Sequence, residues 1–161
     1  MMTIRPATSA DADRIADFNI ALAHDTENIT LHPPTVRDGV RAVLEDPAKG
    51  FYFVAEIDGQ VVGQVMVTYE WSDWRNGNIW WLQSVFVAAP YRGRGVFKSL
   101  FAHVLAESRK RPEVCGLRLY MENHNHTARK VYQTLGMRQS NYVVFESQMG
   151  NAAPQQRGVR E

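Results

Sequence analysis

The sequence predicts a mixed α/β domain with the element order β-α-α-β-β-β-α-β-α-β. Hydrophobic residues make up 45% of the chain, enough for a sizeable core. Apolar residues recur at helical spacing in four segments, and apolar runs bounded by turn residues are typical of strands. A strand–helix–strand unit at 79–121 predicts one parallel strand pair in an otherwise mostly antiparallel sheet. We therefore expect a mixed sheet with helices on both faces.

The first part of the chain predicts a strand and two helices. Residues 3–5 read as a short opening strand, and Ser9 is typical of a helix N-cap. The helix after it carries apolar residues on one face, namely Ile15, Phe18 and Leu22. Pro33-Pro34 breaks the chain, and Thr35 can cap a second helix that stops near Pro47.

The next part predicts a three-stranded meander. Strands are expected at 51–57 and 61–69, joined by a hairpin turn at Asp58-Gly59. Asn76-Gly77-Asn78 reads as a further turn, and the third strand follows at 79–87. Because this strand is nearly all apolar, we expect it to be buried on both faces.

The rest of the chain predicts two helices that alternate with two strands. One helix follows a Gly- and Arg-rich turn and ends before Pro112. A strand at 114–121, a helix at 127–135 ended by Gly136, and a last strand at 142–147 come after it.

Length and charge narrow the class of protein. The 161 residues fit one domain, which we place at 1–149, followed by a flexible tail at 150–161 that is rich in Gly, Ala, Pro and Gln. The net charge of +1 gives no general pull toward nucleic acid or membrane. The chain has one cysteine, no apolar run long enough for a bilayer and no apolar leader, so we expect a cytoplasmic protein.

The Gly- and Arg-rich turn has the features of an anion site. Arg92-Gly93-Arg94-Gly95 lies between a buried strand and a helix, where the first N–H groups have no intrahelical partner and the helix dipole is positive. The dinucleotide fingerprint fails because Lys98 holds the place of its third glycine, and a P-loop fails because Phe97 precedes Lys98-Ser99. The alternative is a purely structural turn with a solvated basic rim.

Two motifs resemble the GNAT acetyltransferase superfamily. The stretch Arg92-Gly93-Arg94-Gly95-Val96-Phe97 is similar to the acetyl-CoA motif of that family, with Phe97 in place of its final small residue. A second stretch matches a late family motif in spacing, with Met137 in place of Phe, through Asn125, Ala128, Tyr132 and Gly136. Two motifs at the right separation are more specific than either alone.

The resemblance implies a fold and a reaction. The fold is the GNAT fold, whose parallel strand pair splays apart. The co-substrate is acetyl-CoA, and the reaction is transfer of the acetyl group to a primary amine by direct attack in a ternary complex. Backbone groups of Val85, Phe86 and Val87 would hold the pantetheine, and N–H groups from Arg92 to Phe97 the pyrophosphate. Asn125 would contact the pantetheine arm, and Tyr132 would be the general acid beside the sulfur, although a core tyrosine is the alternative.

Several residues are candidates for the general base and for the acceptor site. Family members often use a carboxylate, directly or through water, to take the proton of the amine. The nearest candidates are Glu70 and Asp73, and Glu27 lies in the loop that covers the acceptor site in the family. Four tryptophans fall within 71–81, and Trp71 and Trp80 are candidates for an aromatic wall around the acceptor. Core filling and a homodimer surface are alternatives for the tryptophans, and a solvated surface position for each carboxylate.

Other functions stay open. An acyl-CoA-binding sensor without catalysis, or an interaction module that uses the tryptophans, fits the same scaffold. We expect no metal, because His124 and His126 have no second ligand cluster and the lone Cys115 alternates with core residues on a strand. The expected partner is a small-molecule or protein amine.

Overall fold

The computed structural model describes residues 1–147, 149 and 156–157, and their contacts divide them into two compact units. The first unit comprises Met1–Leu119 with the strand at 156–157, and the second comprises the described part of 120–153. The single domain at 1–149 stays a prediction. The tail predicted at 150–161 lies outside the described residues except for Gln156 and Arg157.

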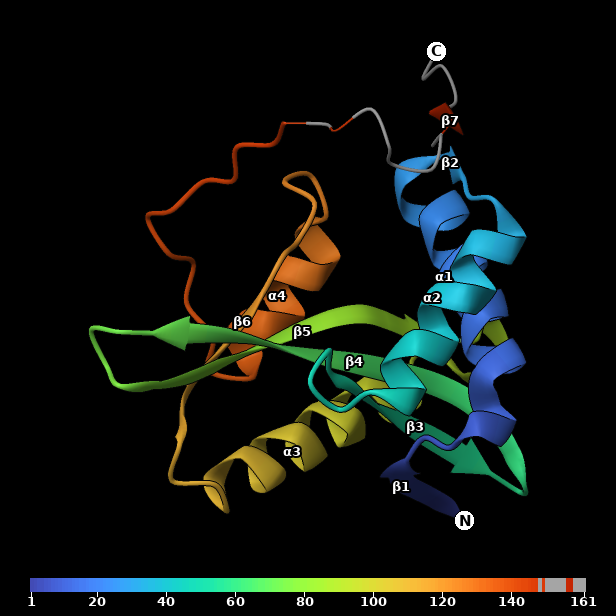
Figure 1. Ribbon diagram of the computed structural model, residues 1–161. Helices are drawn as coiled ribbons and strands as arrows, with labels where there is room; N and C mark the ends of the chain where they lie inside the picture. The colour runs from blue at the N-terminus through green and yellow to red at the C-terminus, as the bar shows by residue number, and fades with distance from the viewer. Residues whose placement is uncertain (148, 150–155, 158–161) are drawn as a thin grey trace. The chain divides into compact units, whose positions relative to one another are not determined.

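The first unit is built on a five-stranded sheet in the order β1-β3-β4-β5-β6 (Figure 1). Its strands are β1 (Met2–Pro6), β3 (Phe51–Ile57), β4 (Gln60–Ser72), β5 (Gly77–Val87) and β6 (Val114–Leu119). Neighbouring strands are antiparallel except β5 and β6, which are parallel. The mixed sheet predicted from the sequence is therefore confirmed. A separate two-stranded ladder pairs β2 (Ile29–Thr30) with β7 (Gln156–Arg157), and neither was predicted, because two residues carry no periodicity.

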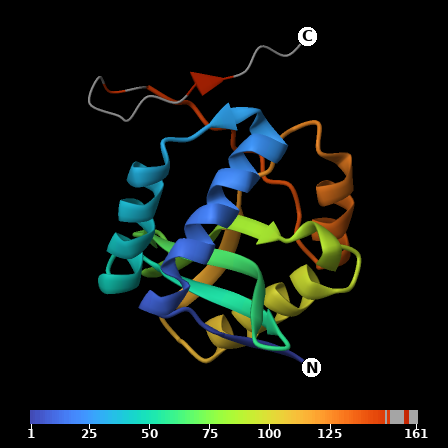
Figure 2. The same cartoon turned by 90° about the vertical axis from the view of Figure 1, so that its right-hand side faces the viewer.

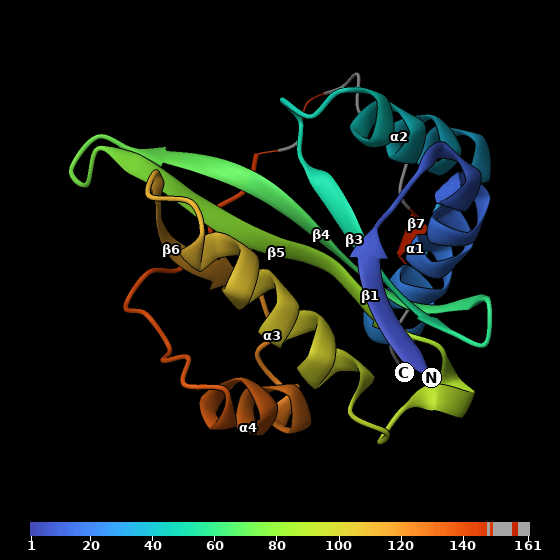
Figure 3. The ribbon, with the colours of Figure 1, turned by 90° about the horizontal axis from the view of Figure 1, so that it is seen from below.

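Helices cover both faces of this sheet. Helices α1 (Ala12–Glu27) and α2 (Pro33–Glu45) run side by side (Figure 2), and α3 (Val96–Arg109) lies on the other face (Figure 3). Apolar side chains with almost no exposed area fill the two interfaces, among them Ile15, Val54, Val62, Val65, Val67, Leu100 and Val104. Burial of this apolar surface is the main force that holds the helices to the sheet.

The Asp58-Gly59 turn forms as the sequence predicts, whereas the turn predicted at Asn76-Gly77-Asn78 lies at 73–76, because Gly77 and Asn78 belong to β5. Asp58 and Gly59 have φ values of 51° and 77°, as a two-residue hairpin turn requires. No residue of β5 is exposed, but five of its eleven residues are buried and the other six are half-buried, so the predicted burial on both faces is confirmed only in part. Its hairpin with β4 extends to Ser72 and Gly77, beyond the predicted ends of both strands.

Two predicted starts of helices were wrong. A short 3₁₀ helix, η1 (Ser9–Asp11), precedes α1, so Ser9 lies inside a helical turn rather than at a cap. Pro33 and Pro34 form the first turn of α2, where a missing N–H costs nothing, so they open the helix that they were predicted to precede. The Thr35 hydroxyl bonds the ring of His32, the N-cap residue, at 2.9 Å.

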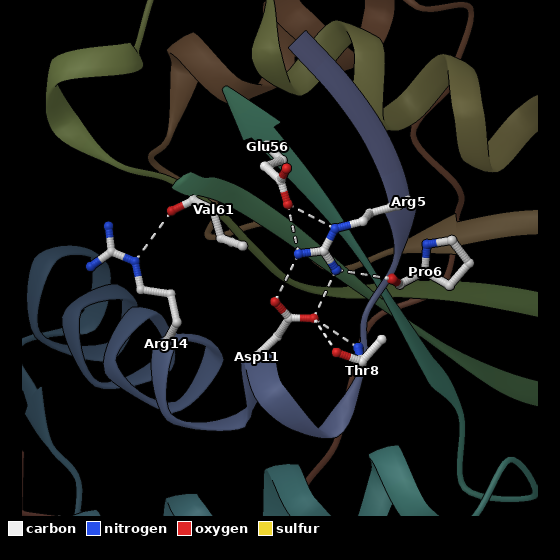
Figure 4. Close-up of polar contacts among 7 residues, drawn as sticks. All are labelled: Arg5, Pro6, Thr8, Asp11, Arg14, Glu56 and Val61. Atoms are coloured by element: carbon white, nitrogen blue, oxygen red, sulfur yellow. Dashed lines mark hydrogen bonds and ion pairs between the residues drawn. The ribbon is translucent and has the colours of Figure 1, made fainter. Parts of the chain in front are cut away.

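An ion-pair cluster fixes the entry of the chain into α1 (Figure 4). The guanidinium of Arg5 on β1 donates to both carboxylate oxygens of Asp11, at 2.8 and 2.9 Å, and to Glu56 on β3 at 2.9 Å. The buried Asp11 carboxylate also accepts from the N–H and hydroxyl of Thr8. The hydrogen bonds from Arg5 hold the pKa of Asp11 below its usual range, against the opposing effect of burial.

The second unit contains α4 (His126–Thr134), followed by Gly136 with a φ of 84°. The strand predicted at 142–147 was wrong, because these residues form no regular element. Tyr142 and Phe145 are 75% and 92% exposed. The described part of the second unit contains no strand with which residues 142–147 could pair. An isolated strand would leave its backbone groups unpaired.

Candidate active site

The edge of β5 opens where β6 leaves it. The parallel ladder runs from Asn78 to Leu82, which pairs with Leu119, the last residue of β6. Beyond Leu82, the described residues supply no strand partner on this side of 83–87. Backbone groups of the predicted pantetheine segment, Val85 to Val87, thus lie on an open strand edge.

A β-bulge interrupts the opposite edge of the same segment. The ladder between β4 and β5 shifts register between Gln64, which pairs with Phe86, and Met66, which pairs with Gln83. Ser84 lies in this bulge with a φ of 49°, a left-handed conformation that is uncommon for a residue other than glycine. The strand therefore changes direction just before Val85.

The Gly- and Arg-rich turn forms a run of free amide groups between β5 and α3. It follows a short 3₁₀ helix, η2 (Ala89–Tyr91), and both Gly93 and Gly95 have positive φ, 74° and 80°. In the described part of the chain, the four N–H groups from Gly93 to Val96 donate to no backbone or side-chain acceptor. Val96 begins α3, whose first turn carries no acidic side chain, so the positive end of the helix dipole is unopposed.

Cationic side chains surround this run of amide groups. Arg92 is turned back on the protein: its Nε donates to the Val87 carbonyl oxygen at 2.8 Å, and its guanidinium pairs with Asp25 at 3.4 Å. Arg94 lies over the ring of Tyr91, and Lys98 is exposed on the first turn of α3. Free N–H groups and fixed positive charge form a donor set that fits a pyrophosphate.

A cavity of about 380 Å³ lies between α1, α2 and the sheet. Its walls are mainly aliphatic, and its lining includes Leu22, Leu31, Val36, Gly39, Val40, Val43 and Met66. Ser84 of the bulge also lines it, so the cavity adjoins the open segment of β5. Of the predicted acceptor residues, the structure brings Glu27 to this cavity.

Four polar side chains form a hydrogen-bonded cluster beside the bulge. Gln64 Nε2 donates to Asn19 Oδ1 at 2.7 Å and to the Ser84 carbonyl oxygen at 3.1 Å. Asn19 Nδ2 approaches the Tyr52 hydroxyl at 3.4 Å, and the Ser84 side chain bonds the same hydroxyl. Asn19, Tyr52 and Ser84 line the cavity.

This polar cluster is desolvated. Gln64 has no exposed area and Tyr52 is 3% exposed, and burial raises the pKa of the Tyr52 phenol against the opposing hydrogen bonds from Asn19 and Ser84. Among the described residues, none donates to the buried Gln64 Oε1. A buried oxygen without a donor is costly in free energy.

Sequence reasoning missed this cluster, although a signal existed. Gln64 is a polar residue at the centre of an otherwise apolar strand, and Asn19 follows Phe18 on the buried side of α1. Polar residues at positions that the periodicity assigns to the core are candidates for a site. The two residues are 45 positions apart in the sequence, so their hydrogen bond becomes visible only in the folded structure.

The structure places Glu70 away from the bulge. Its carboxylate accepts from Arg118 on β6 at 3.0 Å and from the Trp81 indole N–H. Glu70 pairs with Ile79, and about 17 Å of strand separate Ile79 from Ser84 at the usual rise per residue. Glu70 and the Gly93–Val96 amide groups are therefore not brought together.

The two tryptophans of the predicted aromatic wall lie in different environments. Trp80 is 2% exposed and packs edge-on against Phe51 at 5.1 Å between ring centroids, so it belongs to the core. Trp71 is 59% exposed and pairs with Asn78 near the tip of the β4–β5 hairpin, close to Asp73 in the turn. Figure 1 shows this tip at the end of the sheet opposite to α1 and α2.

The second unit carries the two other predicted site residues. The Asn125 side chain caps α4 by accepting from the Ala128 N–H at 3.0 Å. Tyr132 is half-buried on α4, and burial raises the pKa of its phenol above the ordinary value. A phenol in this state is protonated at neutral pH.

No helix in the described part of the chain is both long enough and apolar enough to cross a bilayer. No group of three or more His, Cys, Asp or Glu side chains in that part of the chain is placed to hold a metal ion.

Comparison with known proteins gives a consistent result. The profile of the Acetyltransferase (GNAT) family matches residues 18–137. The crystal structure of a possible acetyltransferase from Clostridium difficile 630 is 42% identical, with a TM-score of 0.87 over 92% of this chain and 98% of that chain. No curated protein matches the sequence.

More distant structures share the fold. An aminoglycoside N-acetyltransferase, AAC(6')-Iy, bound to a bisubstrate analogue has a TM-score of 0.77 at 19% identity, over 92% of this chain and 99% of that one. A predicted acetyltransferase from Clostridium acetobutylicum, solved with acetyl-CoA, has a TM-score of 0.76 at 16% identity, over 91% and 96% of the two chains.

Proposed function

Because this chain belongs to the acetyltransferase (GNAT) family, we propose that it transfers the acetyl group of acetyl-CoA to a primary amine by direct attack in a ternary complex. The observation that carries this proposal is the run of free N–H groups from Gly93 to Val96 at the start of α3. These groups bind the pyrophosphate of the co-substrate, and the open edge of β5 at Val85 to Val87 hydrogen-bonds its pantetheine arm.

Arg92 has a supporting part in this site. Its guanidinium already bonds Val87 and Asp25, so it holds the end of β5 against the turn. Arg94 and Lys98 supply further positive charge that attracts the phosphates. The backbone N–H groups then fix their position.

The chemistry requires three proton transfers: one from the ammonium to a base before attack, one from the nitrogen after attack, and one to the departing thiolate. The neutral amine nitrogen attacks the thioester carbonyl carbon, the C–N bond forms, the C–S bond breaks, and the proton that the nitrogen then loses restores the general acid. We assign the proton that the departing thiolate takes to the Tyr132 phenol, which its raised pKa keeps protonated at neutral pH. Asn125 caps the helix that carries Tyr132, and its amide group is the proposed contact for the pantetheine arm.

A carboxylate must take the proton of the incoming ammonium, directly or through water. Glu70 and Glu27 are the candidates, and their surroundings favour Glu27. Glu27 lines the cavity that adjoins the bulge at Ser84, whereas Glu70 is held in an ion pair with Arg118 farther along the sheet.

The fold does not define the amine. AAC(6')-Iy is an aminoglycoside acetyltransferase, and another structure with this fold, from Brucella melitensis, is a ribosomal-protein-alanine N-acetyltransferase with a TM-score of 0.71 at 19% identity. The class of amine must therefore depend on the cavity of this chain.

Release of free thiol from acetyl-CoA in the presence of an amine panel tests the proposal. We expect release that depends on both acetyl-CoA and amine. Binding of acetyl-CoA without release of thiol on any amine, with Tyr132→Phe behaving in every respect as the wild type, would favour a sensor. Failure to bind any CoA species would favour an interaction module.

A further inference from the structure

The cavity beside Ser84 points to a class of acceptor. We infer that it takes a primary monoamine carried on a compact aliphatic or aromatic body, an inference that rests on the proposed acetyl transfer. A volume of about 380 Å³ is within the size range of small-molecule sites.

The polar cluster marks the end of the cavity that receives the nitrogen. Ser84 directly precedes Val85 on β5, where the proposed function binds the pantetheine arm. The hydroxyl groups of Tyr52 and Ser84 and the amide of Asn19 line this end. They offer acceptors for the N–H groups of an amine, and the buried Gln64 Oε1 behind them accepts from none of the described residues.

The rest of the lining selects an apolar body. It is formed by side chains that cannot hydrogen-bond, namely Leu22, Ala23, Leu31, Val36, Val40, Val43 and Met66. Each CH₂ group of a ligand that is buried here gains free energy by leaving water. A hydroxyl or ammonium group at the same place loses its water without a partner.

The single carboxylate limits the charge of the ligand. Of the described residues that line the cavity, Glu27 alone is charged. Glu27 lies eight positions after Asn19 on α1, which separates the two by about 12 Å along the helix. One ammonium group can be drawn in by Glu27 and passed to the polar end, but the further ammonium groups of a polyamine or an aminoglycoside have no partner in the cavity.

Gly39 on α2 offers a way to test the cavity without disturbing the fold. It lines the cavity, and a Cβ built at this position meets no atom within 4 Å. The substitution Gly39→Leu therefore fills the cavity from its wall, and it replaces glycine by a better helix former. Asp38→Leu is the matched control, because Asp38 is exposed on the same helix and does not line the cavity.

The experiment combines turnover and binding. For the wild-type protein we expect kcat/KM for isoamylamine and phenethylamine to exceed that for spermidine and neamine by about tenfold or more. Gly39→Leu raises KM for phenethylamine by about tenfold and changes that for ethylamine little, while Asp38→Leu behaves as wild type. We expect Gly39→Leu to bind phenethylamine more weakly than the wild type and Asp38→Leu, as measured by calorimetry without acetyl-CoA.

The outcomes separate the inference from the proposed function. Turnover that is fastest on spermidine or neamine, or equal phenethylamine KM values in Gly39→Leu and wild type, overturns the inference while acetyl transfer stands. Absence of turnover on every amine contradicts the proposed function. In that case the calorimetry alone decides the inference: loss of phenethylamine binding in Gly39→Leu supports it, and binding that the substitution leaves unchanged overturns it.

Discussion

Gln64 Nε2 donates to the carbonyl oxygen of Ser84 at 3.1 Å, across the bulge where β4 and β5 shift register. This bond holds Ser84 in a left-handed conformation, which costs free energy on its own. The same nitrogen bonds Asn19 Oδ1 on α1. One buried amide therefore joins the helix, the bulge and the cavity.

The substitution Gln64→Leu tests this relationship. It keeps most of the side-chain volume but leaves two partly buried acceptors, Asn19 Oδ1 and the Ser84 carbonyl, without their donor. We expect a loss of about 1–3 kcal/mol in the free energy of unfolding, measured by urea denaturation. We also expect kcat/KM for acetyl transfer to fall by about tenfold or more, because the bulge positions the open segment of β5.

Gln83→Leu is the matched control for this substitution. Gln83 lies on the neighbouring strand β5, and its Nε2 donates to the Thr68 hydroxyl rather than to the bulge. If both variants lose activity equally, the role assigned to Gln64 is wrong.

Tyr132→Phe removes the proposed general acid. We expect kcat to fall about a hundredfold while the affinity for acetyl-CoA stays near that of the wild type, measured by steady-state kinetics and calorimetry. Because burial raises the pKa of this phenol above 10.0, the wild-type kcat loses its acid-dependent part only above that pH.

Tyr69→Phe is the control for the loss of a tyrosine hydroxyl. Burial raises the pKa of Tyr69 too, and its hydroxyl donates to the Pro47 carbonyl in a different part of the first unit. A large loss of acetyl-CoA affinity with normal kcat in Tyr132→Phe would refute the acid role.

The two candidate bases are separated by a pair of substitutions. Glu27→Gln should lower kcat/KM for the amine by about tenfold or more, because it removes the one charged group that lines the cavity in the described chain. Glu70→Gln should change kcat/KM less, and its effect should appear in stability through the lost pair with Arg118. If Glu70→Gln lowered kcat/KM more than Glu27→Gln in an activity assay, Glu70 would be the base.

The Arg5–Asp11 pair predicts how stability depends on pH. The folded-state pKa of Asp11 lies below its unfolded value of about 3.9, so the pair contributes fully above that pH and is lost as the pH falls through the folded-state pKa. Asp11→Asn should lower the free energy of unfolding at pH 7 by about 1–3 kcal/mol, since Arg5 is partly exposed and keeps Glu56.

Urea denaturation at pH 7 and at about pH 3 measures this dependence. The difference between wild type and Asp11→Asn should shrink at the lower pH. Asp58→Asn is the control, because Asp58 pairs with the N-terminus in full solvent and should change stability little. A constant difference at both pH values would show that the ion pair is not its source.

The sheet could be predicted from the sequence because its signals are local. The apolar runs in β3 and β4, the Asp58-Gly59 turn and the helical stripe of α3 each depend on a few neighbouring residues. The strand at 142–147 was predicted on the same kind of signal and does not form. Its residues are apolar, but strand formation also needs a neighbouring strand, which periodicity cannot supply.

The site could be predicted only in part. The Gly93–Val96 turn has a local signature, since glycine spacing and a following helix define it. The polar cluster joins residues from α1, β3, β4 and β5, and the tryptophans at 71–81 are close in sequence but divided between core and surface. The tryptophans were grouped into one site because they are close in sequence, although the fold separates them. Asn19 and Gln64 were missed because they are far apart in sequence, although the fold brings them together.

The affinity for CoA of the Gly95→Asp variant, measured by calorimetry, tests the central claim most directly. Gly59→Asp is its matched control, because both glycines have φ near 80° and open space around a built Cβ, but Gly59 lies in the β3–β4 hairpin. If the Gly93–Val96 amide groups bind the pyrophosphate, Gly95→Asp weakens CoA binding about a hundredfold or more and Gly59→Asp leaves it unchanged. Equal CoA affinity in Gly95→Asp and wild type would contradict the account.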